Sequence, residues 1–227
     1  MLSARLFLPR KMPGPSCRPL LVSACPPVEP KPKPWLLVGL GNPGKKYEGT
    51  RHSVGFEMID TIAQEEGILV SSIRFKALVG KGSIGGVPVL LAKPQTFMNA
   101  SGESVGSIVS YFNIPLNQVL VIFDDLDLPF AKLRMLPKGG HGGHNGMRSV
   151  IDHFKGSREF PRLRIGIGRP PGKMDPVNFV LRPFTRHERE EVLSWNPGLL
   201  TAIHLRRFNN IGLHFGEWIR SCEDTFA

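Results

Sequence analysis

The chain has 227 residues and a formal net charge of +10, with 29 lysines and arginines against 19 acids. This length suits one α/β domain with an extension, and the basic balance favours a polyanionic partner or a basic targeting segment. Three scattered cysteines exclude a disulfide framework or a cysteine zinc site.

Residues 1–34 form a basic, acid-poor leader. They contain six lysines and arginines, one acid (Glu29) and nine of the 21 prolines. No apolar run in them is long enough to span a bilayer. This composition is typical of an organellar transit peptide that is removed from the working protein, and the alternative is a disordered tail without an address.

The first predicted element is a buried strand over residues 35–40, which ends in a glycine-rich turn. Gly39, Gly41 and Gly44 match the G-x-G-x-x-G pattern of dinucleotide sites. That pattern requires a helix to open at the glycines, whereas the next helical periodicity begins only near Val54. We therefore do not favour a nucleotide-binding domain.

Periodicity and turn residues predict the remaining elements. These are a helix from Val54 capped by Ser53, strands 74–84 and 87–93 joined as a hairpin by Gly85 and Gly86, a helix with Val105, Ile108, Val109 and Phe112 on one face, strands at 119–123, 132–136 and 162–168, and a helix from Asn145. The interleaved pattern predicts a single α/β domain: a mixed, mostly parallel twisted sheet with helices on both faces. In such sheets ligands bind beyond the carboxyl ends of the strands.

A glycine-rich stretch, Lys138–Gly146, precedes the last of these helices, and we call it the glycine loop. A loop of this kind offers free backbone N–H groups and the positive end of a helix dipole to an anionic or polar ligand. The alternative is a flexible surface loop. Polar groups at the other strand ends favour a site, because Asn42, Asn99 and Asp124 all follow predicted strands and converge on the same edge.

These residue types suit hydrolysis without a metal. A neutral His52 imidazole can take a proton from water, and a carboxylate such as Asp124 can fix its tautomer. Asparagine amides can hold a carbonyl oxygen as it becomes negative. Because no serine or cysteine lies in a nucleophile elbow, direct attack by water is favoured. The alternative is that His52 is an ordinary loop histidine.

Two metal sites were weighed against this hypothesis. His141 and His144 could share a metal, but the glycines between them fix no geometry and no third ligand is evident. Asp124, Asp125 and Asp127 could hold magnesium, although neighbouring residues at a strand end point apart. We expect no metal and no cofactor.

Five motifs in this order resemble the bacterial-type peptidyl-tRNA hydrolases, in their plant organellar branch. They are Gly39–Gly44 with Tyr47 and Thr50–His52, Thr96–Asn99, Asp124–Pro129, Gly139–Gly146 and Arg162–Gly168. The resemblance covers residues 35–190, which leaves residues 191–227 as a divergent C-terminal segment. It implies hydrolysis of the ester between a peptide and the terminal ribose of tRNA, with peptidyl-tRNA as the partner.

The resemblance also implies a role for each matching residue. His52 would be the base, Asp124 its carboxylate, and Asn42 the group that distinguishes an acylated amino group from a free one. Asn99 and Asn145 would hold the peptide and the attacked carbonyl. The groove would be lined by Tyr47, Phe97 and Met98, His144 and Arg164 would be supporting residues, and Lys132 and Arg134 would bind tRNA phosphates without reading sequence.

The chain departs from the family pattern at Ser53, where an asparagine is usual, and at Ala131, where a glycine is usual. A second hypothesis is a non-catalytic RNA-binding relative that assists organellar intron splicing. The enzyme is favoured because His52, Asp124 and the asparagines are all present. We expect a chloroplast protein, with the mitochondrion as the alternative, that is monomeric and not membrane-bound.

Overall fold

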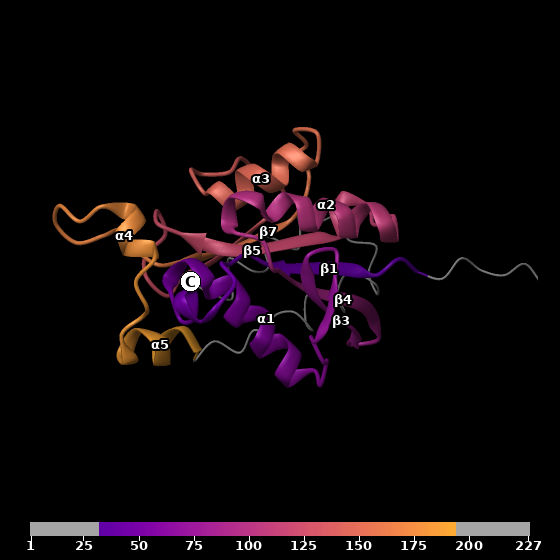
Figure 1. Cartoon of the computed structure of the whole chain (residues 1–227), viewed down its shortest axis with the longest axis horizontal. Coiled ribbons are helices and arrows are strands. Elements are labelled where there is room, and N and C mark those ends of the chain that lie inside the picture. The colour runs from indigo at the N-terminus through magenta and orange to yellow at the C-terminus, as the bar shows by residue number, and fades with distance from the viewer. Residues whose placement is uncertain (1–31, 194–227) are drawn as a thin grey trace, which may run out of the picture. The chain divides into compact units, whose positions relative to one another are not determined.

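The computed structural model describes residues 32–193, so most of the predicted leader and most of the predicted divergent segment lie outside the described residues. Within this part seven strands form one sheet in the order β2-β3-β4-β1-β5-β7-β6 (Figure 1). The strands are β1 Trp35–Gly39, β2 Ser72–Arg74, β3 Ala77–Ile84, β4 Val87–Pro94, β5 Val119–Asp125, β6 Leu133–Leu136 and β7 Arg162–Gly166.

The sheet is mixed, as predicted. The central strands are parallel, with β1 between β4 and β5 and with β7 beside β5. The antiparallel pairs lie toward the two edges. Every residue of β5 is buried, which explains the apolar run of its first five residues: a strand covered on both faces has no side chain to offer to water.

Helices cover both faces of the sheet. They are α1 Val54–Glu65, α2 Ser101–Phe112, α3 Asn145–His153, α4 Pro176–Val180 and α5 Arg186–Leu193. Helices α2 and α3 lie on one side, and α1 and α5 on the other (Figure 1). Two apolar clusters result, one on each face of the sheet. None of the described helices is long and apolar enough to cross a membrane.

The predicted hairpin of β3 and β4 is confirmed, but the strand predicted to begin at Arg74 is wrong at its start. The chain turns at Phe75 and Lys76, and Ser72–Arg74 forms the separate edge strand β2. Both turn residues have positive φ angles, 52° and 55°. Such angles are uncommon outside glycine, so the sequence carries no turn signal at this point.

The start of α1 lies unusually close to β1. A Cβ on Gly39 would lie 2.0 Å from the carbonyl oxygen of Gly55, so only glycine allows this approach. The predicted start of the helix is confirmed, but its predicted cap is wrong: the Ser53 hydroxyl makes no capping bond and instead accepts from the backbone N–H of Asn42, at 3.3 Å. This packing places His52, just before α1, beside the end of β5.

Candidate active site

A cavity of about 490 Å³ lies at the carboxyl ends of β1, β4 and β5, and we call it the central cavity. Nine of the twelve predicted site residues line it, from four separate stretches of the chain. They are Asn42, Tyr47, His52, Phe97, Met98, Asn99, Asp124, His144 and Asn145. The other three, Lys132, Arg134 and Arg164, lie outside its lining.

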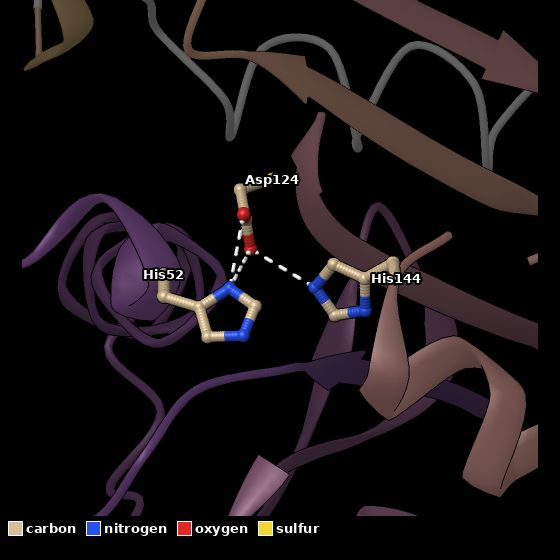
Figure 2. Close-up of side chains that lie close together, drawn as sticks. All are labelled: His52, Asp124 and His144. Atoms are coloured by element: carbon tan, nitrogen blue, oxygen red, sulfur yellow. Dashed lines mark hydrogen bonds and ion pairs between the residues drawn. The ribbon is translucent and has the colours of Figure 1, made fainter. Parts of the chain in front are cut away.

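His52 and Asp124 meet at the wall of this cavity. Nδ1 of His52 lies 2.9 Å and 3.0 Å from the two carboxylate oxygens of Asp124 (Figure 2). The His52 side chain is 13% exposed and that of Asp124 only 3%. Because Nδ1 donates to the carboxylate, Nε2 of the neutral ring carries a lone pair. The imidazole therefore offers an acceptor at the cavity while its partner is buried behind it.

A second imidazole contacts the same carboxylate. Nε2 of His144 lies 3.0 Å from Oδ1 of Asp124, and its Nδ1 accepts the backbone N–H of Met147 at 3.1 Å. This second bond makes His144 the N-cap of α3, as its predicted position before a helix indicates. Since Nδ1 is the acceptor, the neutral ring carries its proton on Nε2 and donates it to Asp124. The tautomer of His144 is thus set by the helix.

The charges of this group are coupled. Burial by itself lowers the pKa of His52, but the charge of Asp124 and the hydrogen bond to it raise that pKa above its ordinary value. Burial raises the pKa of Asp124, whereas attraction to His144 and His52 and their hydrogen bonds lower it by more. Asp124 is therefore an anion at neutral pH, and it makes His52 a stronger base.

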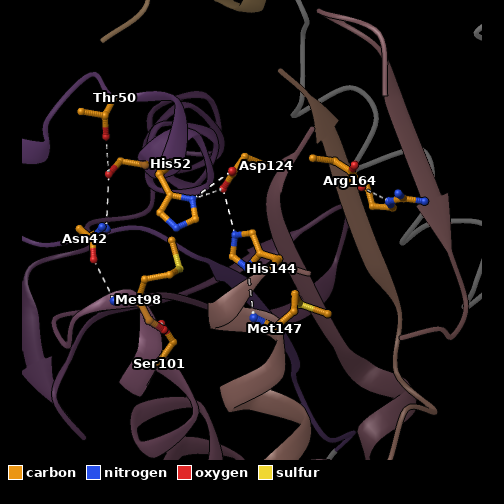
Figure 3. A network of polar contacts seen from close by, with 11 residues as sticks. Asn42, Thr50, His52, Met98, Ser101, Asp124, His144, Met147 and Arg164 are labelled. Carbon is orange, nitrogen blue, oxygen red and sulfur yellow. Dashed lines mark hydrogen bonds and ion pairs between the residues drawn. The ribbon is translucent and has the colours of Figure 1, made fainter. Parts of the chain in front are cut away.

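The amide of Asn42 has a fixed orientation. Its Oδ1 accepts the backbone N–H of Met98 at 2.8 Å (Figure 3). Because this oxygen must face a donor, the NH₂ group is the end left for a ligand. Asn42 therefore presents donors, so it suits a carbonyl oxygen on the ligand rather than an ammonium group.

Aromatic and amide side chains continue the wall beyond Asn42. Tyr47 and Phe97 pack edge to face with 6.5 Å between ring centroids, and Phe97 is 65% exposed. Met98 is buried and also lines the cavity, so it adds to the apolar part of the wall. Asn99 and Asn145 are exposed at its rim, where their amides can reach a bound ligand.

Sequence reasoning missed the cover of the cavity. Four residues at α4 also line it: Pro176, Val177, Val180 and Leu181. Asp175 caps this short helix by accepting the N–H of Asn178 at 3.2 Å. The signals were present: an acid before proline, then apolar residues at helical spacing.

Arg51 holds this cover in place. Its guanidinium makes two hydrogen bonds of 2.8 Å to the carboxylate of Glu188 and donates at 2.9 Å to the carbonyl oxygen of Pro183. It also lies over the rings of Phe179 and Phe184. We call these contacts the Arg51 tether. They connect the segment that carries α4 and α5 to the residue next to His52.

Both predicted metal alternatives include a residue of the group formed by His52, Asp124 and His144, so the donors of this group bear on both. His52, Asp124 and His144 could surround an ion, because their ligand atoms lie within 4.8 Å of one another. However, the imidazole nitrogens that face Asp124 carry protons, which makes them donors rather than ligands. Asp125 and Asp127 are paired with Arg164 and Arg169. The group is better suited to moving a proton than to holding a metal.

The basic residues lie on the neighbouring edge of the sheet. Lys132 and Arg134 are exposed at β6, and Arg134 stands opposite Arg164 of β7 in the antiparallel register. Arg164 also pairs with Asp125, the residue after Asp124. A row of cations therefore leads toward the site from the edge strand.

Comparisons with known proteins agree with this geometry. The family model described as peptidyl-tRNA hydrolase matches residues 36–209, which extends past the predicted limit at residue 190. The chain is 78% identical over 160 residues to a mitochondrial peptidyl-tRNA hydrolase of Oryza sativa subsp. japonica, covering 70% of this chain and 64% of that protein. It is 71% identical over 172 residues to the chloroplastic peptidyl-tRNA hydrolase of Arabidopsis thaliana, covering 76% and 60%.

The chain is also similar to a plant splicing protein and to a bacterial crystal structure. A chloroplastic group IIB intron splicing facilitator of Zea mays is 58% identical over 159 residues, covering 70% of this chain and 62% of that protein. The crystal structure of the Acinetobacter baumannii peptidyl-tRNA hydrolase has a TM-score of 0.67 at 37% identity, covering 71% of this chain and 82% of that one. The chain spans less than two thirds of the length of these plant relatives.

Proposed function

Because the chain belongs to the peptidyl-tRNA hydrolase family, we propose that it hydrolyses the ester between a peptide and the terminal ribose of tRNA. One observation carries this proposal: an imidazole at the wall of the central cavity has its protonated nitrogen held by a buried carboxylate. That arrangement leaves the other nitrogen free to activate water, and the chemistry needs no covalent intermediate.

The reaction follows from these positions. Nε2 of His52 takes a proton from a water molecule as its oxygen attacks the ester carbonyl carbon. Asp124 stabilises the imidazolium that forms, and the amides of Asn99 and Asn145 stabilise the negative oxygen. The carbon–oxygen bond to the ribose then breaks, and the ribose oxygen takes the proton from His52. The products are a free peptide acid and a tRNA with its hydroxyl restored.

Asn42 supplies the selectivity for a blocked amino group. In peptidyl-tRNA the amino group next to the ester is acylated, and the new amide has a carbonyl oxygen. The NH₂ end of Asn42 can donate to that oxygen because its own oxygen is occupied by Met98. A free aminoacyl group offers an ammonium at the same place, which cannot accept a hydrogen bond.

The test compares release of N-acetyl-aminoacyl and free aminoacyl groups from tRNA by the full chain. We expect rapid release of the first and a rate on the second close to spontaneous hydrolysis. Asn42→Asp is expected to reduce the ratio of the two rates at least about tenfold, because a carboxylate repels the acyl oxygen and accepts from an ammonium. No release of either group would overturn the proposed function, and an unchanged ratio in Asn42→Asp would overturn the role of Asn42.

Lys132 and Arg134 are proposed to bind the tRNA phosphates. Replacing both by alanine is expected to raise KM at physiological salt. The slope of log KM against log salt should fall by about 2, since two phosphate contacts are lost, and kcat should stay within about twofold. Arg74→Ala with Lys76→Ala is a matched control, because it removes the same charge from the opposite edge of the sheet. Equal slopes in the two double variants would count against phosphate binding by Lys132 and Arg134.

The second candidate function is a non-catalytic role in RNA splicing, which the similarity to the splicing facilitator of Zea mays favours. A protein with only that role has no need to keep His52, Asp124 and the oriented amide of Asn42 around one cavity. Their arrangement around one cavity favours the enzyme.

The names of the relatives support an organellar location, since those two hydrolases are mitochondrial or chloroplastic. We propose the chloroplast, with the mitochondrion as the alternative, and a monomer that acts on peptidyl-tRNA.

A further inference from the structure

Two smaller hollows adjoin the central cavity on different sides. The first, of about 460 Å³, shares Asn42 with it, and we call it the acidic hollow because Glu48, Glu57 and Asp60 line it. The second, of about 310 Å³, shares Phe123, Asp125 and Gly142, and we call it the arginine hollow. An ester substrate has two arms that must leave the reacting carbon in different directions, so each hollow is a candidate for one arm.

The charges of the two hollows differ. In the acidic hollow the cations Lys93 and Arg189 are paired with Asp60 and Glu57, and Lys45 balances the charge of Glu48, so the hollow has no net charge. In the arginine hollow Arg164 is paired with Asp125, but Arg162 has no ion pair with any described carboxylate. The arginine hollow therefore keeps an uncompensated positive charge, and it suits the polyanionic arm of the substrate.

Arg162 is an unusual group in this position. Its side chain lies in a residue only 1% exposed, and its Nη atoms donate to four carbonyl oxygens: Gly139 at 2.6 Å, Gly140 at 2.8 Å, Arg158 at 3.0 Å and Phe160 at 3.2 Å. Its Nε–H is buried and has no acceptor among the described residues. The guanidinium is therefore fixed at the wall of the hollow by backbone carbonyls, and what it offers a ligand there is its charge rather than a free N–H.

The charge of Arg162 persists at neutral pH. Burial lowers its pKa to about 10, and the nearby charges of Arg164 and Arg158 act in the same direction. His141 adds a further donor. Its Nδ1 accepts the N–H of Gly143 at 3.0 Å, so the proton of the neutral ring is on Nε2. The hollow thus combines donors for oxygen atoms with an apolar wall at Leu136 and Phe123.

We propose that the arginine hollow binds the 3′-terminal nucleotide of the tRNA, on the side of the ester opposite to the peptide. Its base would lie against Leu136, its oxygens would accept from Nε2 of His141, and its phosphate would be attracted by the charge of Arg162. The peptide would leave past Asn42 toward the acidic hollow. This assignment rests on the proposed function, because it takes the ester to lie at His52. It gives the RNA and the peptide separate exits from one cavity.

The main test narrows the arginine hollow by enlarging an apolar side chain, and it leaves every charged residue unchanged. Leu136 is half-buried on β6 and lines it, so Leu136→Phe and Leu136→Trp add progressively larger rings. KM for N-acetyl-aminoacyl-tRNA is expected to rise about tenfold in Leu136→Trp and less in Leu136→Phe, with kcat within about twofold. Leu133→Trp is the matched control. It adds the same ring to the same strand, but on the opposite face of the sheet, where Leu133 packs against the apolar cluster that includes α1.

A binding measurement on the full-length wild-type protein separates this inference from the proposed function. The probe is the trinucleotide cytidine–cytidine–adenosine with a free 3′-hydroxyl, followed by NMR of arginine Nε–H groups. Binding is expected to shift the Arg162 resonance, because the anionic ligand lies beside its guanidinium, whether or not the protein hydrolyses the ester.

The outcomes are distinct. An unmoved Arg162 resonance at saturating trinucleotide would overturn the inference. So would equal KM values for a folded Leu136→Trp variant and the wild type. If Leu136→Trp has a lowered Tm and does not fold, the Leu136→Phe kinetics and the wild-type NMR titration decide. Absence of turnover together with a shifted Arg162 resonance would support the hollow and reject only the hydrolase activity.

Discussion

Replacing His52 by alanine is expected to lower kcat for N-acetyl-aminoacyl-tRNA by about 10²–10⁴-fold, because the variant has no group at this position to take a proton from water. The affinity for tRNA should stay within about twofold, since the basic residues lie on the edge strand and not around His52. Single-turnover release of the acyl group measures the first quantity, and filter binding of uncharged tRNA measures the second.

The matched control is His187→Ala, which removes an exposed imidazole from α5. This variant should keep wild-type turnover. If His52→Ala retains wild-type activity, His52 is not the base. If it loses tRNA affinity in proportion to activity, the residue acts in binding or folding instead.

Asp124→Asn is expected to have the second largest effect, a fall in kcat on the order of 10³–10⁴-fold. The amide has nearly the same shape, but it offers one acceptor oxygen and one donor group to the two imidazole N–H groups that face the carboxylate. His144 is held to its tautomer by the N–H of Met147, so it would retain the oxygen. His52 would then turn its lone pair toward the new NH₂ group and lose its acceptor at the cavity.

The pH profile provides the check on this mechanism. Protonated His52 cannot accept a proton, so kcat/KM of the wild type should fall as pH drops through the pKa of His52. Since Asp124 raises that pKa, the midpoint of this acid limb should lie above the ordinary value of 6.5. In Asp124→Asn the raising charge is gone while burial still lowers the pKa, so the limb should move to lower pH. A limb that stays in place would show that another group titrates.

Much of this site could be predicted because the carboxyl ends of parallel strands meet at one edge of the sheet, where ligands bind. Asn42, Asn99 and Asp124 are far apart in sequence, yet each ends or follows a strand whose carboxyl end faces the same edge. The apolar run of β5 predicted a strand buried on both faces, and that burial explains why Asp124 is shielded. The glycine loop before a helical periodicity likewise predicted the place of His144 at the start of α3.

Other features could not be predicted, for identifiable physical reasons. The turn at Phe75 and Lys76 uses positive φ angles that neither residue type signals. The hydroxyl of Ser53 had a local role available as a cap, but a long-range bond to Asn42 took its place. Arg162 resembled an ordinary strand residue, because burial of a cation against backbone carbonyls depends on where the chain returns and not on its own neighbours.

The Arg51 tether has a consequence for the interpretation of mutants. Glu188 lies in α5, far from His52 in the sequence, yet its carboxylate accepts hydrogen bonds from Arg51, the residue before His52. A substitution there would release the cover and loosen the turn that carries the imidazole at the same time. Substitutions at Glu188 should therefore lower activity in the same way as loss of His52. A mutational screen that measures activity alone would classify Glu188 as a catalytic residue, although it only positions His52.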